Sequence, residues 1–358
     1  MRDVYKYFDK STFLTLLALS LMGVLLIYSA SRGMNHPYWS KQLLWLGVSV
    51  LAFFLFFRVK FEQALRFCFF FYVILNSALF LQFVTGELVA NTKSWIKMGF
   101  FSIQISEFIK IPLALFLART LARFSTIGWK EYLKLIAAIG VPFLFIAIQP
   151  DLGTAFMLAS FFLTSIFLRR TRMVFIIIIL VSAVVGSFVG WNYVLKPYQR
   201  ERVISFLNPE EHKKTSGYQI IQSKIAIGSG GLTGKGYLNG TQSQYKFLPT
   251  RHTDFIVSVL GEEFGFMGIS VLLMLFFTLF YRQFNFKVQS DEEFYFIYLF
   301  NTLLLFQFLI NILMTIGFVP IMGVPMPFVS YGGSSLLAFF IGEALIFRIK
   351  ISSYLNEF

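Results

Sequence analysis

The residues best placed to do chemistry stand where a polar loop leads into an apolar helix, between residues 247 and 268. The loop ends in His252, Thr253 and Asp254. A carboxylate at or inside a membrane span is costly, about 2.5 to 3.5 kcal/mol at mid-bilayer, so such a residue indicates a functional site by default. Asp254 therefore has three interpretations here: passage of ions, packing of helices, or catalysis by a carboxylate that accepts a proton.

Three more charged residues are expected at the depth of Asp254. Glu107 and Lys110 are three residues apart, which places them on one helix face about 4.5 Å apart along its axis. Asp151 begins the next helix of the same direction. These residues form either an ion-pair network that only orients helices or the wall of a catalytic pocket. We favour the pocket, because three carboxylates and a lysine at one depth exceed what packing needs in a chain with 18 acidic residues.

Two glycine-rich segments are candidates for contacting an anion. The first, PMPFVSYGGSS, contains Ser330, Gly332 and Gly333 just before an apolar helix, where exposed backbone N–H groups suit a phosphate. The alternative is a simple break between two helices. The second, GSGGLTGKG, contains Lys235 and is not a P-loop, because Ser229 replaces the first glycine and no strand precedes it. We interpret it as a flexible basic loop over the pocket, acting as a lid or contacting a headgroup, with a purely structural loop as the alternative.

The elements that position these residues are membrane helices. The chain is 57% hydrophobic with 47 Phe, which predicts an all-α polytopic membrane protein with one integral membrane domain over residues 1–358. Apolar runs and their breaks predict about ten transmembrane helices. Their approximate ranges are 11–30, 41–57, 67–86, 105–121, 134–149, 152–168, 173–191, 254–281, 294–317 and 332–349.

Positive charge predicts the orientation of these helices. With the N-terminus inside, the cytoplasmic segments carry 17 Lys and Arg and the short outer segments carry four. Both termini are therefore expected in the cytoplasm, and residues 192–253 form one long extracellular loop with amphipathic interfacial helices. The net charge of +13 indicates attraction to membrane lipids rather than to nucleic acid, because the basic residues are dispersed along the membrane edges.

Five blocks in order give this chain a resemblance that runs over nearly its whole length. They are SWIKMGFFSIQISEFIK (94–110), QPDLGTA (149–155), GYQIIQSKIAIGSGGLTGKG (217–236), FLPTRHTDFIVSVLGEEFG (247–265) and GVPMPFVSYGGSS (323–335). The chain resembles the SEDS family (shape, elongation, division and sporulation), whose members include the RodA and FtsW cell-wall polymerases. Ile105 departs from this pattern, since the family often has proline there.

The resemblance implies a peptidoglycan glycosyltransferase in the bacterial cytoplasmic membrane. Such an enzyme polymerises lipid II into glycan strands at the outer face, and the RodA branch does so during elongation. The resemblance also implies a class B penicillin-binding protein as partner and a divalent cation, Mg or Mn, as cofactor. It assigns the essential acid to Asp254 and supporting positions to Glu107, Lys110 and Asp151. Asp254 is then a general base or a metal ligand, and both roles stay open.

Two other classes compete with this interpretation. Ten helices with intramembrane charges also suit a flippase for lipid II or another lipid-linked precursor, although we find no clear inverted repeat. A scaffold for wall-synthesis proteins is the third class. A nucleophilic triad is excluded, because the chain has one cysteine and three scattered histidines.

Overall fold

The computed structural model describes residues 7–34, 36–85, 94–98, 101–124, 128–169, 173–212 and 216–355, and it is mostly helical. Each range in which we expected a membrane span contains helical residues. The long helices are α2 (Lys10–Ala30), α3 (Tyr38–Phe57), α4 (Phe61–Thr85), α6 (Lys110–Ala122), α7 (Trp129–Ile148), α8 (Leu152–Leu168), α9 (Met173–Val189), α13 (Ile256–Phe284), α14 (Asp291–Thr315) and α15 (Gly333–Leu355).

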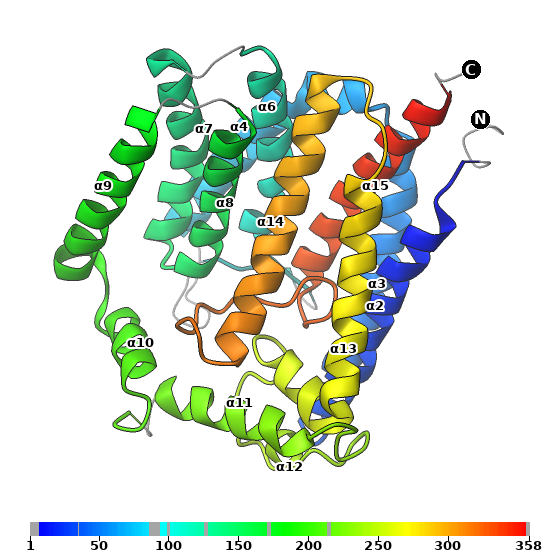
Figure 1. The fold of residues 1–358 in the computed structure, drawn as a ribbon, viewed down its shortest axis with the longest axis vertical. Coiled ribbons are helices and arrows are strands. Elements are labelled where there is room, and N and C mark those ends of the chain that lie inside the picture. The colour runs from blue at the N-terminus through cyan, green and yellow to red at the C-terminus, as the bar shows by residue number, and fades with distance from the viewer. Residues whose placement is uncertain are drawn as a thin grey trace.

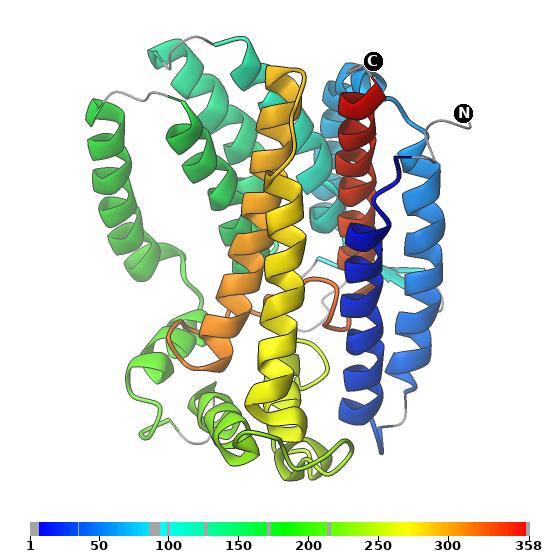
Figure 2. The ribbon, with the colours of Figure 1, turned by 45° about the vertical axis from the view of Figure 1, so that its right-hand side comes forward.

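Among the described residues, six helices are long and apolar enough to cross a membrane: α2, α3, α4, α7, α13 and α14. The long helices stand side by side as one bundle (Figure 1), with the N- and C-terminal ends of the chain at the same end of it. Within the bundle α15 packs on α3, α14 packs on α6 and α8, and α13 packs on α2. Figure 2 shows the same arrangement after a turn of the molecule.

Helices α4, α7 and α14 begin three to six residues before the expected position. The first turns of α4, α7 and α14 include Glu62, Lys130 and Asp291, which we had assigned to loops. Glu62 and Asp291 are favourable there because the helix dipole attracts anions to a first turn, and Lys130 is exposed to solvent, so an uncharged run underestimates helix length. In α14, for example, Ser290 and Glu293 form a capping box, with the Ser290 hydroxyl accepting from the Glu293 N–H at 3.2 Å.

The expected helix over 105–121 is divided into α5 (Ile105–Phe108) and α6, separated at Ile109. Pro112 explains the break, because proline has no N–H to donate to the carbonyl of Phe108 four residues earlier. Before α5 the chain forms a short antiparallel hairpin of β1 (Ile96–Met98) and β2 (Phe101–Ile103), which the sequence did not lead us to expect.

The segment before α13 forms a layer across the end of the bundle opposite the termini (Figures 1 and 2). It contains the π-helix η1 (Gly190–Val194), α10 (Pro197–Leu207), α11 (Ser216–Gly230) and α12 (Thr241–Gln244). We expected amphipathic interfacial helices in this segment. In α11, Ile225 is exposed, whereas Ile220 and Ala226 are buried against the protein. Between them, Ser223 bonds to the Ser258 hydroxyl at 2.7 Å, which ties α11 to α13.

The glycine-rich segment 230–236 pairs with a break in α13 rather than lying free over a pocket. Gly265 interrupts α13 with φ 60° and ψ −157°. The N–H groups of Lys235 and Gly236 donate to the carbonyls of Glu262 and Glu263, each at 3.0 Å. A Cβ at Gly234 would lie 2.2 Å from the Glu263 carbonyl oxygen, so this close pairing of backbones requires glycine there.

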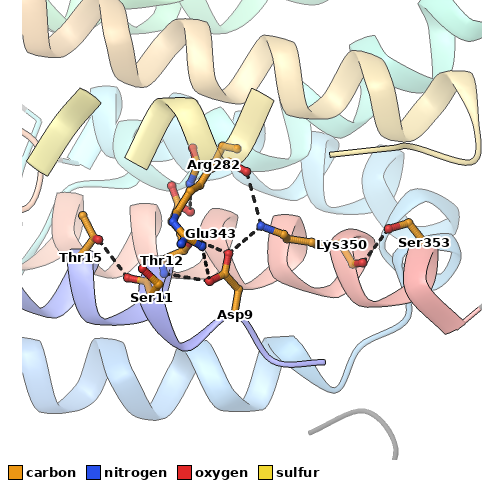
Figure 3. Close-up of polar contacts among 9 residues, drawn as sticks. Asp9, Ser11, Thr12, Thr15, Arg282, Glu343, Lys350 and Ser353 are labelled. Atoms are coloured by element: carbon orange, nitrogen blue, oxygen red, sulfur yellow. Dashed lines mark hydrogen bonds and ion pairs between the residues drawn. The ribbon is translucent and has the colours of Figure 1, made fainter. Parts of the chain in front are cut away.

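At the opposite end, Asp9 connects three helices that are distant in sequence (Figure 3). It caps α2 by accepting from the Thr12 N–H at 3.1 Å, and it pairs with Arg282 of α13 at 3.0 Å and Lys350 of α15 at 2.6 Å. Partial burial of Asp9 acts to raise its pKa, but the bonds from Lys350 and Thr12 outweigh it and lower the pKa to about 2. These contacts hold the start of α2 against α13 and α15.

Candidate active site

Asp254 lies in the turn just before α13, which begins at Ile256, so the residue is outside the helix that we expected to contain it. Its backbone carbonyl accepts a hydrogen bond from the Asn311 side chain of α14 at 3.0 Å. The same Asn311 amide donates to the Val324 carbonyl at 2.7 Å. One buried side chain therefore fixes both the Asp254 turn and the loop that precedes α15.

The other predicted residues of this turn are held by the same loop. The Ser330 hydroxyl donates to the Thr253 carbonyl at 2.5 Å, and the Tyr331 N–H donates to the His252 carbonyl at 2.9 Å. The His252 ring stacks on Tyr38 at 4.4 Å between centroids. Burial and then the charge of Arg251 lower the pKa of His252 to about 4. His252 is thus neutral near pH 7 and supports the turn by packing.

The Asp254 carboxyl faces Gly323, where an added Cβ would lie 3.9 Å from the carboxyl Oδ2. Loss of contact with water raises the pKa of Asp254 to about 6, although the charge of Arg202 and a bond from Thr253 oppose this rise. The carboxyl is thus mostly ionised at neutral pH yet more basic than an ordinary aspartate. A group with these properties can accept a proton from a substrate.

Arg202 of α10 is a site residue that the sequence did not single out. Its guanidinium Nη1 donates to the Ile321 carbonyl at 3.3 Å, two residues from Gly323 beside the Asp254 carboxyl. It also lies 5.9 Å from the centroid of the Tyr198 ring. We had expected basic residues of the long loop near the site as a group. Only the path of α10 across the end of the bundle distinguishes Arg202 from its neighbours.

Glu107 and Lys110 form a buried ion pair. The Lys110 Nζ lies 2.8 Å from Glu107 Oε1, and the two side chains are 3% and 5% exposed. Lys110 also donates to the Gln307 side chain at 3.3 Å, and Gln307 in turn donates to the Pro325 carbonyl at 3.0 Å. Through Gln307 the pair is connected to the loop beside Asp254. The second oxygen of Glu107 is buried without a hydrogen-bond partner.

Asp151 joins this pair at the start of α8. It accepts from the Thr154 N–H at 3.2 Å as the helix cap and from the Gln104 side chain at 2.7 Å. Burial raises the pKa of Asp151, and the bond from Thr154 opposes the rise. The charges of Glu107 and Lys110 also act on its carboxyl. The structure thus brings Glu107, Lys110 and Asp151 into one electrostatic group.

The remaining predicted residues have structural partners. The Gly332 N–H donates to the Gln42 side chain at 3.2 Å, and a Cβ at Gly333 would lie 2.2 Å from the Trp45 ring. Gly333 thus allows close contact with α3 and the Gly332 N–H is already bonded to it, which favours the packing interpretation over an anion site. Lys235 pairs with Glu262 at 2.8 Å in the glycine-rich segment.

The carboxylates and histidines that the structure describes form no preformed metal site. Across the described ranges there is no group of three or more His, Cys, Asp or Glu that could hold a metal ion. Asp254 would be a single protein ligand, so the other oxygens would have to come from a bound substrate. Magnesium is often bound in this manner, by one or two carboxylates and substrate phosphates.

The fold and the site define a polytopic helical protein with a partly desolvated carboxylate at the end of its bundle remote from the chain termini. Its sequence then gives the family. The chain belongs to the cell cycle protein family that groups FtsW, RodA and SpoVE, because the family model matches residues 9–355. It is accordingly a multi-pass membrane protein.

Individual relatives agree over nearly the full length. The chain is 35% identical to the peptidoglycan glycosyltransferase MrdB of Escherichia coli, covering 96% of this chain and 93% of MrdB. It is 34% identical to the peptidoglycan glycosyltransferase RodA of Treponema pallidum, covering 96% and 97%. It also resembles a chain from a solved peptidoglycan synthase complex with a TM-score of 0.84, at 26% identity, covering 97% and 98%.

Proposed function

We propose that this protein is a peptidoglycan glycosyltransferase that polymerises lipid II into glycan strands. The observation that carries the proposal is Asp254, a carboxylate with a raised pKa beside Arg202. Its turn is held by Asn311 of α14, by Ser330 of the loop before α15 and by Tyr38 of α3. The full-length similarity to MrdB and RodA supports the same activity and favours a role in cell elongation and shape. The flippase alternative has no comparable support, because these relatives carry glycosyltransferase names.

The reaction assigns a role to each residue near the turn. A hydroxyl of one glycan attacks the anomeric carbon of another, and its proton passes to the Asp254 carboxylate as the new glycosidic bond forms. The bond from the anomeric carbon to the pyrophosphate breaks, and the lipid pyrophosphate departs with its electron pair. Arg202 binds that pyrophosphate and stabilises its charge, a contribution that is often the largest in such transfers. General-base catalysis by Asp254 contributes about 10² to 10⁴ in rate.

Glu107, Lys110 and Asp151 serve this site as positioning residues. Lys110 is 2% exposed and already paired, so its contribution reaches Asp254 through Gln307 and the loop at Pro325. These contacts keep the loop beside Asp254 in one conformation. Thr253, His252 and Ser330 act in the same manner from the other side.

A divalent cation, Mg or Mn, gives the alternative role for Asp254, because a carboxylate that binds the ion is less basic than a free one. Asp254 would contribute one oxygen and the substrate pyrophosphate the others, since the described residues supply no larger acidic group. When bound, the ion supplies charge stabilisation to the leaving pyrophosphate. Removal of divalent ions with a chelator should then slow polymerisation and leave the folded protein intact.

We place this site at the outer face of the bacterial cytoplasmic membrane, with ten spans and both termini inside. The two chain ends lie at one end of the bundle, and α10, α11 and α12 lie at the other (Figure 1), which supports this orientation. The basic residues counted for the cytoplasmic segments support it too. A class B penicillin-binding protein is the proposed partner, in line with the synthase complex that the fold resembles.

The test uses the purified full-length chain in proteoliposomes with fluorescent lipid II. We expect glycan polymer from the chain alone or after addition of its penicillin-binding partner. Transfer of lipid II between leaflets, without polymer under either condition, would contradict the proposal and favour a transporter.

A further inference from the structure

A cavity that the proposed reaction does not use opens between α4, α6 and α7. Its volume is about 500 Å³, within the range of about 300 to 1,000 Å³ that small-molecule sites occupy. None of the residues that line it belongs to α10, α11, α12 or the Asp254 turn. The cavity is therefore separate from the Asp254 site.

One wall of this cavity is apolar. The Tyr72 and Phe116 rings stack at 5.4 Å with an interplanar angle of 17°. The Tyr72 hydroxyl donates to the Ala138 carbonyl at 2.8 Å, so the phenol presents its ring and not its polar group. Val141 completes the wall and is 40% exposed. Such a surface suits a hydrocarbon chain.

The mouth of the cavity is basic. Arg123, at the C-terminal cap of α6, and Lys134 of α7 both line it and both are exposed. The Lys134 Nζ lies 5.6 Å from the centroid of the Phe124 ring, which holds the ammonium near the opening. No acidic residue is among those that line the cavity in the described part of the chain. Two cations thus stand above an apolar wall.

We propose that this cavity binds an anionic phospholipid of the adjacent leaflet. Its phosphate would lie between Arg123 and Lys134, and one acyl chain would lie along Tyr72, Phe116 and Val141. Basic pockets between membrane helices on the cytoplasmic side bind anionic headgroups in this manner. The charge selects an anionic lipid over a zwitterionic one, and the apolar wall selects a lipid over a free phosphate.

The experiment is native mass spectrometry of the full-length protein in detergent, titrated with phosphatidylglycerol and, separately, with phosphatidylcholine. We expect the wild type to retain phosphatidylglycerol preferentially. Arg123→Gln combined with Lys134→Gln should weaken that binding by about fivefold for each cation removed, the effect of one basic residue near a charged lipid surface. The matched control is Lys130→Gln, an exposed lysine on α7 that does not line the cavity.

A second variant tests the apolar wall without changing any charge. Ala137 lines the cavity and is exposed, so Ala137→Phe should fill the space, keep α7 folded and also reduce retention of phosphatidylglycerol. This variant decides the matter if the double substitution does not fold. Equal retention of the two lipids, unchanged retention in Ala137→Phe, or displacement of the lipid by inorganic phosphate would overturn the proposal.

Discussion

The raised pKa of Asp254 makes the pH dependence of polymerisation an informative test. A base with a pKa of about 6 is half ionised at pH 6, about nine-tenths ionised at pH 7 and about one-tenth ionised at pH 5. Because only the ionised carboxylate accepts a proton, kcat/KM should fall about tenfold between pH 7 and pH 5. An aspartate with the usual pKa near 3.8 would lose only about 6% over that interval.

The assay measures initial rates of polymerisation at low lipid II concentration between about pH 4.5 and pH 8. Each sample is returned to neutral pH to show that the loss is reversible and does not reflect unfolding. The Arg202→Gln variant should move the acidic limb of the pH–rate profile to higher pH, because the charge that lowers the pKa of Asp254 is removed.

Arg200→Gln is the matched control for this shift. Arg200 lies on the same helix, but its guanidinium donates to the Asn192 carbonyl at 3.0 Å instead of reaching the Ile321 loop. The acidic limb of the pH–rate profile of Arg200→Gln should stay at the wild-type position. A rate that is constant down to about pH 4.5, or limbs that coincide for all three proteins, would refute the assignment of Asp254 as the base.

Three further predictions concern stability, measured by thermal unfolding in detergent. Lys110→Met leaves the Glu107 carboxylate buried without its cation and should cost about 3 to 5 kcal/mol, whereas adding Glu107→Gln should recover part of the loss; additive losses would argue against a coupled pair. Gly265→Ala should cost about 1 to 3 kcal/mol, because its Cβ would lie 2.4 Å from the Gly234 nitrogen at positive φ, while Gly47→Ala, with open space around it, should be neutral; equal effects would refute the backbone argument. Asp9→Asn should cost about 2 kcal/mol at neutral pH; this stabilisation is present above the unfolded pKa near 3.8 and is lost as pH falls through about 2, so a pH-independent difference over that interval would contradict it.

The sequence located the long helices because a membrane span requires a long apolar run and basic residues collect in the segments between spans. It misplaced the first turns of α4, α7 and α14, because charged residues are tolerated in a first turn and so do not mark where the helix starts. It also missed the break at Ile109, although Pro112 supplied a local signal for it. Local patterns were therefore sufficient for the order of the long helices but not for their ends.

The site was predictable only in part, for a similar reason. Asp254, Glu107 and Asp151 stand in recognisable blocks next to helix starts. Arg202 stands in a long polar segment, and its approach to Asp254 depends on how α10 crosses the bundle. The glycine-rich segment was expected to cover a pocket, whereas its glycines pair with the break at Gly265, a long-range contact that local spacing does not reveal.

The most direct test of the central claim is polymerisation of lipid II by the purified Asp254→Asn variant beside Asp291→Asn. The two substitutions make the same chemical change, but Asp291 is a surface residue at the start of α14 with a side chain 69% exposed. Burial raises the pKa of Asp254, so its ionisation opposes folding at neutral pH and Asp254→Asn should stay folded. We expect Asp254→Asn to lose about 10² to 10⁴ in rate while Asp291→Asn keeps wild-type activity. Undiminished glycan product from folded Asp254→Asn would contradict the assignment of this carboxylate to catalysis.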